Sequence, residues 1–247
     1  MKLSLVILLY ISIQLELCGQ AANITSHNYK DSSSSKRYNI TVNYPQVDFG
    51  PDALMGIRGI AQDINHSIDT LRENLVNDFM NEVKGLPPAP CTDQPSYLEV
   101  SYKTEYNNSS LFSFRFETFS APDCANHPYT YITALNYSAA SVGAFKLADV
   151  FIKDKPWLKF ISGYTRNELI ARAKKDKLDN SGGNIEEGTA PVEDNFRVFT
   201  VNGKGLTIIF NPYRVGPWIW GIQSVEIPYS EMKDMIDPGG PLSSVIK

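Results

Sequence analysis

Few side chains of this 247-residue sequence have the chemistry that catalysis needs, and they are scattered along it. Its three histidines are His27 near the N-terminus, His66 within a helical pattern and His127 in an expected loop beside Pro128. A nucleophile–histidine–acid triad needs a histidine held between a nucleophile and an acid. Only His127 falls near predicted strands, and a histidine in a loop is more often structural than catalytic. We therefore expect no catalytic residues, and we predict that the protein is not an enzyme.

Carboxylates form no recognisable site either. Glu99, Glu105 and Glu117 fall in strand-like stretches on the side expected to face water, so no acid pair of the glycosidase type stands out. The acidic residues at 186–187 and 193–194 lack the regular oxygen-ligand spacing of a dedicated calcium loop. The absence of this spacing favours a solvated surface loop over a calcium site. With three cysteines and three histidines in all, a Cys/His metal site is also disfavoured, and we expect neither a metal nor a cofactor.

The composition is that of a folded protein, with 43% apolar and 20% charged residues. The formal net charge is −4 at pH 7, and no dense run of Lys and Arg occurs. This argues against nucleic acid or an anionic membrane surface as the main partner.

The N-terminus has the features of a secretory signal. A basic start precedes an apolar run at 3–13, and the small residues Gly19 and Ala21 precede a cleavage point after Ala21. The alternative is a transmembrane anchor, but the run is well short of the ~20 residues that a bilayer requires. No other segment is apolar enough to span a membrane. The sequence therefore predicts a signal peptide at 1–21 and a secreted, extracellular protein.

Secretion bears on the cysteines and on the asparagines. Cleavage would remove Cys18 and leave Cys91 and Cys124, which we expect to form a disulfide in an oxidising compartment. N-glycosylation sequons exceed the number expected by chance and indicate a glycoprotein. They begin at Asn23, Asn39, Asn65, Asn107, Asn108 and Asn136.

Periodicity predicts one long helix, a shorter helix and several strands. Residues 57–83 carry apolar side chains at steps of three and four, which predicts a helix with its stripe in a core. A shorter helix is expected at 156–175. Strands are predicted at 38–44, where Pro45 should break the pattern, and at 97–106, 111–119, 129–137, 196–201, 205–210 and 223–227, with a short helix at 230–236. In the strand at 111–119, phenylalanines alternate with polar residues, so one face should be buried and the other wet.

These elements predict an α+β fold in which an antiparallel sheet packs against one long and one shorter helix. No linker divides them, so we expect a single domain at 37–236. The polar residues 22–36 are predicted to be a flexible leader and residues 237–247 a flexible tail.

The segment from Gly205 to Lys233 carries a recognisable pattern of Gly-Leu, an apolar strand, Phe-Asn-Pro-Tyr, Gly, a second apolar strand and Ile-Pro. It resembles the closing motif of a bacterial extracellular domain family. That family includes the mycobacterial secreted immunogenic protein, the lysozyme-binding ectodomain of an anti-sigma factor, and the N-terminal module of some peptidoglycan deacetylases. The resemblance covers about residues 37–236. It implies a fold but no catalytic residues, since the deacetylases keep catalysis in a separate domain.

The residues of this motif have structural roles on physical grounds. Asn211 and Pro212, followed by Tyr213, should end a strand, because proline lacks a donor and restricts its predecessor. Gly221 would allow a backbone conformation that other residues avoid, and Pro228 should end the last strand. Trp218 and Trp220 lie between Tyr213 and Gly221, and we favour a place in the core for both. The alternative is an exposed aromatic anchor, which requires at least one exposed indole in a patch with Tyr213 or Tyr229.

Together these features favour a secreted, non-enzymatic glycoprotein whose domain binds another extracellular protein. By analogy with the family, a lysozyme-like hydrolase is one candidate partner. One alternative is a structural component of an extracellular matrix such as a shell, coat or wall. A second, less favoured alternative is a polysaccharide hydrolase, which would require His127 and a carboxylate in one pocket.

Overall fold

The computed structural model describes residues 22–141, 143–175 and 185–246, so the predicted signal peptide at 1–21, with Cys18, lies outside the described residues. Its longest element is α2 (Met55–Lys84), which includes the helix predicted at 57–83. The buried side chains of α2 recur on one face, as residues three, four or seven apart must. They are Ala61, Ile64, Ile68, Leu75 and Phe79. All five belong to one hydrophobic core, which confirms the stripe as a core-facing one.

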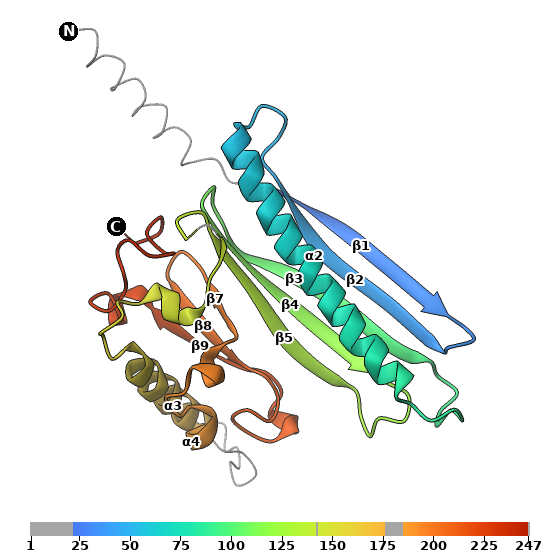
Figure 1. Cartoon of the computed structure of the whole chain (residues 1–247). Coiled ribbons are helices and arrows are strands. Elements are labelled where there is room, and N and C mark those ends of the chain that lie inside the picture. Colours follow the sequence, from blue (N-terminus) through green and yellow to red (C-terminus); the bar gives the residue numbers. More distant parts are fainter. Residues whose placement is uncertain (1–21, 142, 176–184, 247) are drawn as a thin grey trace, which may run out of the picture.

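This face of α2 packs against a six-stranded sheet. Its strands lie side by side in the order of the sequence: β1 (Asn23–Ser33), β2 (Tyr38–Asp48), β3 (Ser96–Asn107), β4 (Leu111–Ala121), β5 (Tyr129–Ser138) and β6 (Gly143–Ala144). Neighbouring strands are antiparallel except β2 and β3, which are parallel. A parallel pair requires a long crossover connection, and α2 provides it. The helix therefore lies across the sheet, as Figure 1 shows.

The C-terminal half of the chain forms a second, three-stranded antiparallel sheet with its own core. Its strands and helices are β7 (Phe199–Val201), β8 (Gly205–Phe210), β9 (Gln223–Pro228), α3 (Trp157–Lys175), α4 (Ile185–Gly188), and the 3-10 turns η1 (Leu147–Val150), η2 (Glu193–Phe196), η3 (Trp218–Trp220) and η4 (Tyr229–Glu231). The fold is thus α+β in a single domain, as predicted. Its helices cover two separate sheets rather than one, and the short helix expected at 230–236 is limited to η4.

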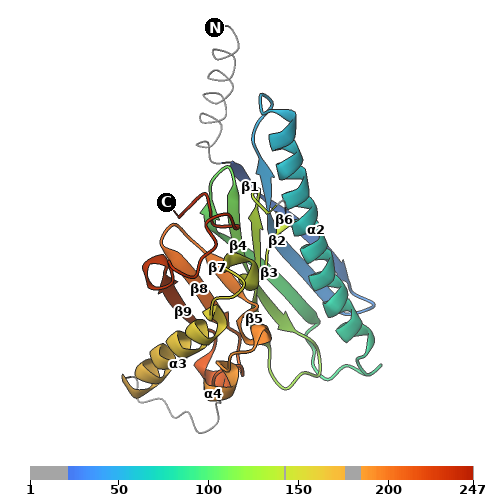
Figure 2. The same ribbon diagram turned by 60° about the vertical axis from the view of Figure 1, so that its left-hand side comes forward.

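The two cores lie on opposite sides of the large sheet (Figure 2). On β4 the phenylalanines at 112, 114 and 116 pack in the α2 core. The intervening Ser113 is fully buried on the other face, where its hydroxyl accepts a hydrogen bond from the Val201 N–H of β7 at 3.1 Å. The prediction of one wet face is therefore wrong at this end of β4. Side chains on that face are covered by the three-stranded sheet.

Both termini of the domain are more ordered than the sequence predicted. The expected leader is wrong, because residues 23–33 form β1 and pair with β2 from Asn23↔Asp48 to Ser33↔Tyr38. Its side chains are polar and its order comes from backbone pairing, which composition does not reveal. The expected tail is wrong too. Leu242 is fully buried, and the Ser138 hydroxyl donates to the Pro241 carbonyl at 2.8 Å.

The predicted strand break at Pro45 is also wrong. Strand β2 continues to Asp48, and Pro45 lies opposite Ser26 of β1. The parallel ladder with β3 ends at Val42, so Pro45 falls where the missing N–H costs no bond to β3.

The predicted disulfide is present: Cys91 and Cys124 are bonded, with their Cα atoms 5.0 Å apart. Beside it lies the buried carboxylate of Asp123. This carboxylate accepts hydrogen bonds from the backbone N–H groups of Cys91, Thr92 and Cys124 and from the Thr92 hydroxyl. Burial alone would raise the pKa of Asp123, but these hydrogen bonds outweigh it and hold the pKa below its usual value. The loops that carry Cys91 and Cys124 are therefore joined both by the disulfide and by the hydrogen bonds of the Asp123 carboxylate.

Replacing Cys91 and Cys124 together with serine should lower stability without abolishing the fold. In the chain-entropy model, a crosslink over 33 residues contributes about 3–4 kcal/mol. For a domain of this size this corresponds to a fall in Tm of roughly 10 °C. Thermal unfolding followed by circular dichroism would measure it, with reduced wild-type protein as the control. Loss of cooperative unfolding in the double variant would contradict the expectation that the two cores suffice.

Asp123 should make the free energy of unfolding depend on pH in the acidic range. Because its pKa is lowered in the folded state, its contribution is fully present above the ordinary value of 3.8 and is lost as pH falls through the lower folded value. Denaturant unfolding at a series of pH values below about 5 should show stability falling less steeply in Asp123→Asn than in the wild type. Identical pH profiles would show that these hydrogen bonds do not favour the ionised carboxylate.

Candidate functional site

The strand end predicted at Asn211 and Pro212 also joins the two sheets. Asn211 follows β8, and its side-chain amide bonds to both backbone groups of Ile132 on β5. The Ile132 N–H donates to Asn211 Oδ1 at 2.6 Å, and Asn211 Nδ2 donates to the Ile132 carbonyl at 3.0 Å. The amide thus takes the place of a neighbouring strand. Sequence reasoning assigned only the strand end, because nothing local reveals the partner 79 residues away.

A second asparagine, Asn136, also joins the sheets, and it lies on β5 itself, beyond Ile132. Asn136 Nδ2 donates to the Phe199 carbonyl of β7 at 2.8 Å, and its Oδ1 accepts from the Ser113 hydroxyl at 2.7 Å. Only 4% of Asn136 is exposed. The folded domain has no room for a glycan at this buried nitrogen. The sequon is a local pattern that carries no information on burial.

Three other sequon asparagines also have the amide nitrogen engaged. Asn65 on α2 exchanges two hydrogen bonds with the backbone of Val47, and Asn107 Nδ2 donates to the Ala22 carbonyl. Asn108 Nδ2 donates to the Tyr106 hydroxyl. In the folded chain these nitrogens are structural. Asn23 and Asn39 are exposed, and glycosylation there stays a prediction.

After Asn211 the chain turns outward and presents Tyr213. Its φ is +70°, in the left-handed region that non-glycine residues seldom adopt, and its side chain is 65% exposed. The Tyr213 hydroxyl lies 3.4 Å from Nε2 of His127, which belongs to the loop before β5. Strained backbone of this kind is often found at functional sites. The closing motif thus brings its tyrosine to the one histidine that the sequence placed near the sheet.

Trp218 completes this surface. The ring centroids of Trp218 and His127 are 4.8 Å apart, and 42% of Trp218 is exposed. Its neighbour Ile219, which sequence reasoning did not single out, is 82% exposed. We call His127, Tyr213, Trp218 and Ile219 the aromatic patch. The core position favoured for Trp218 is wrong, and the alternative of an exposed indole near Tyr213 describes it.

Trp220 differs from Trp218. It is half-buried and packs against the C-terminal core. A Cβ on Gly216 would lie only 2.1 Å from its ring, so the turn has room for glycine alone. Gly221 has φ +64°, as the motif led us to expect, and Pro228 ends β9. These residues fix the turn that directs Trp218 and Ile219 outward.

The histidines do not meet one another or a catalytic set. His27 lies exposed on β1 and His66 exposed on α2, whereas His127 contacts Tyr213 and Trp218. Within the described ranges, no group of three or more His, Cys, Asp or Glu side chains is placed to hold a metal ion. Asp194, in the acidic segment considered for calcium, pairs instead with Arg197 at 3.3 Å and Arg214 at 3.2 Å.

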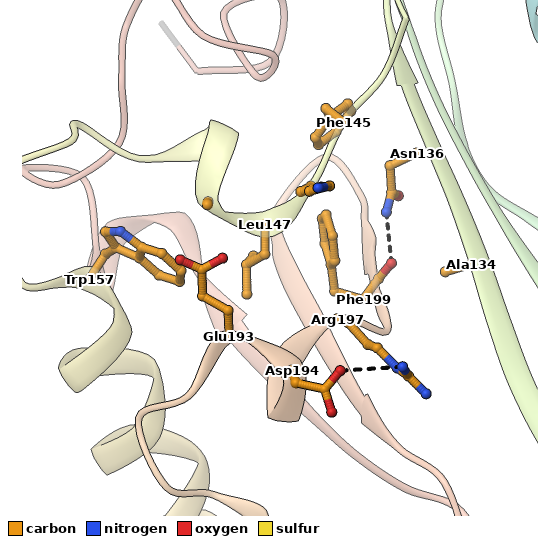
Figure 3. Close-up of a pocket in the computed structure, with 11 residues that line it drawn as sticks. Ala134, Asn136, Phe145, Leu147, Trp157, Glu193, Asp194, Arg197 and Phe199 are labelled. Carbon is orange, nitrogen blue, oxygen red and sulfur yellow. Dashed lines mark hydrogen bonds and ion pairs between the residues drawn. The ribbon is translucent and has the colours of Figure 1, made fainter.

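A cavity of about 320 Å³ lies between β5, η1, η2 and the start of α3. Its apolar wall is formed by Phe145, Leu147, Trp157 and Phe199, and Glu193 and Arg197 lie among its charged residues (Figure 3). Asn136 and Ala134 of β5 close one side. Two carboxylates, Glu193 and Asp194, line it, and Asp194 is paired with Arg197 and Arg214. None of the residues that line it is a histidine. Among the described residues, no helix is both long and apolar enough to cross a membrane.

Comparison with known proteins supports the family resemblance. Residues 148–230 match the model of a family described as "Protein of unknown function (DUF3298)". The chain is 24% identical over 205 residues to the peptidoglycan-N-acetylmuramic acid deacetylase PdaC of Bacillus subtilis (strain 168). The match covers 83% of this chain and 40% of PdaC, so the chain spans less than half the length of this relative.

Two solved structures of DUF3298 proteins have a similar fold. A DUF3298 family member from Bacteroides fragilis NCTC 9343 superposes with a TM-score of 0.62 at 16% identity, covering 93% of this chain and 98% of that one. A DUF3298 family protein from Pseudomonas aeruginosa PAO1 gives a TM-score of 0.56 at 11% identity, covering 90% of this chain and 95% of that one. At these identities the likeness shows the fold alone.

Asn211→Ala should destabilise the domain by about 2 kcal/mol, because it leaves the N–H and C=O of Ile132 without their partner. Urea unfolding followed by fluorescence would measure the loss. Asn126→Ala, at an exposed position in the loop before β5, is the control and should change stability little. If both variants unfold at the wild-type urea concentration, Asn211 does not hold the sheets together.

Proposed function

Because the chain carries a DUF3298 domain similar to the one in PdaC, we propose that it is an extracellular, non-catalytic binding module that docks another secreted protein on the aromatic patch. The observation that carries the proposal is the exposure of Trp218 and Ile219 beside Tyr213 on a turn fixed by glycines.

The composition of the patch favours a protein partner. Trp and Tyr dominate the binding energy of protein interfaces, since each buries a large area at a small cost in side-chain entropy. In this patch both contact His127, and the exposed Ile219 follows Trp218 in the chain. Large apolar side chains gathered on a surface mark interaction sites. His127 packs on the Trp218 ring and so limits the freedom of the indole before binding.

A lysozyme-like hydrolase is the partner we propose, since the family that the chain resembles includes a lysozyme-binding member. The net charge of −4 suits a basic partner, because opposite net charges speed association. The disulfide fits the extracellular setting in which such a hydrolase acts. In this proposal the domain recognises the hydrolase and performs no chemistry on it.

Binding of purified lysozymes of several structural types, measured by biolayer interferometry, would test the proposal. Trp218→Ala and Ile219→Ser should each weaken binding by about tenfold or more, the usual effect of truncating a side chain central to an interface. Val192→Ser removes another apolar side chain, 54% exposed outside the patch, and should leave the affinity unchanged. The proposal fails if no lysozyme binds at about 100 µM, or if the patch variants bind as tightly as the wild type.

A further inference from the structure

The free edge of β5 is occupied on both sides of Ala134. At Ile132, both backbone groups are bonded to the Asn211 amide. At Asn136, the carbonyl accepts a hydrogen bond from the Phe145 N–H at 3.0 Å. In an antiparallel strand, residues two apart direct their backbone groups to the same edge. The N–H and C=O of Ala134 therefore point to this edge, between two positions that are already paired.

Ala134 itself has a neighbouring strand on one side only. The register places it opposite Arg115 of β4, and the ladder with β6 extends over Tyr137 and Ser138 alone. No hydrogen bond recorded for the described residues joins the Ala134 backbone to a group on the β6 side. Instead, Ala134 lines the cavity of Figure 3. The residue that lines the cavity thus carries, at the edge of β5, a donor and an acceptor spaced as one residue of a β-ladder.

The walls of the cavity suit an apolar side chain. Phe145 and Phe199 are 7% and 2% exposed, and their ring centroids are 6.0 Å apart, so the two rings pack together in the wall and leave little aromatic surface open. Leu147 lies beside them, and Arg197 and Glu193 bring charge to the opening. About 320 Å³ lies at the lower end of the range for small-ligand sites, which is roughly 300–1,000 Å³.

We propose that this cavity binds an extended peptide, one residue of which forms a two-bond antiparallel bridge with Ala134 and places its apolar side chain against Phe145, Leu147 and Phe199. The Asn211 amide already makes this pair of bonds two residues earlier, at Ile132. A peptide residue offers an N–H and a C=O on the same side, as strand addition requires. A sugar would need a wide aromatic surface to stack on, and with 7% and 2% exposure Phe145 and Phe199 offer little. The site is separate from the aromatic patch.

Titration of the 15N-labelled protein with the capped tripeptide acetyl-Ala-Leu-Ala-amide, followed by NMR, tests this site. The Ala134 amide signal should shift saturably, together with those of Leu147 and Phe199, which line the cavity. The matched control is the same peptide with a methyl group on the leucine nitrogen. It keeps the side chain but cannot donate to the Ala134 carbonyl, and its affinity should fall about tenfold or more.

A protein variant gives an independent readout. Ala134→Leu keeps the backbone N–H and fills the cavity, so the peptide should no longer shift these signals. Ala171→Leu makes the same change at an exposed position on α3, outside the cavity residues, and should bind as the wild type does. The titrations of the wild type decide the matter even if Ala134→Leu does not fold.

Three results would overturn the proposal. The first is the absence of a saturable shift at Ala134 up to about 20 mM peptide. The second is equal affinity for the peptide and its N-methyl form. The third is tighter binding of a chitin disaccharide than of the peptide at the same signals. Shifts confined to the aromatic patch give the first result, and they leave the proposed docking of a protein there intact.

Discussion

Two asparagine side chains connect the halves of this molecule, and the surfaces it offers depend on them. Asn211 and Asn136 bond across the gap between the sheets, one to each side of Ala134 on β5. Amides suit this task because one group both donates and accepts, and so satisfies backbone groups that would otherwise be buried unpaired. The sheets are thereby fixed at a defined distance along the edge of β5.

Both candidate surfaces lie along this connection. The loop before β5 carries His127, and the chain after Asn211 carries Tyr213 and Trp218, so joining β5 to the end of β8 assembles the aromatic patch. The cavity begins at Ala134, the position of the strand edge left open between Ile132, which is bonded to the Asn211 amide, and Asn136, whose carbonyl accepts from the Phe145 N–H. Elements with few side chains of obvious chemistry thus form two recognition surfaces of different character.

The features that sequence predicts well are those with a local physical cause. The stripe of α2 follows from helical periodicity, and the disulfide follows from two cysteines in an oxidising compartment. Features that depend on a distant partner were predicted wrongly or not at all. The polar β1 is ordered by its pairing with β2, and Asn136 matches a sequon although the second sheet buries it. The exposure of Trp218 depends on the course of the turn around it, which no periodicity reveals.

The measurement that tests the central claim most directly is the affinity of folded Asn211→Ala for a lysozyme that the wild-type protein binds. Asn211 is outside the aromatic patch but holds its two segments together through Ile132. If the connection positions the patch, this variant binds more weakly than the wild type under conditions where both are fully folded. Unchanged affinity in the folded variant would contradict the account, because the patch would then form without the connection between the sheets.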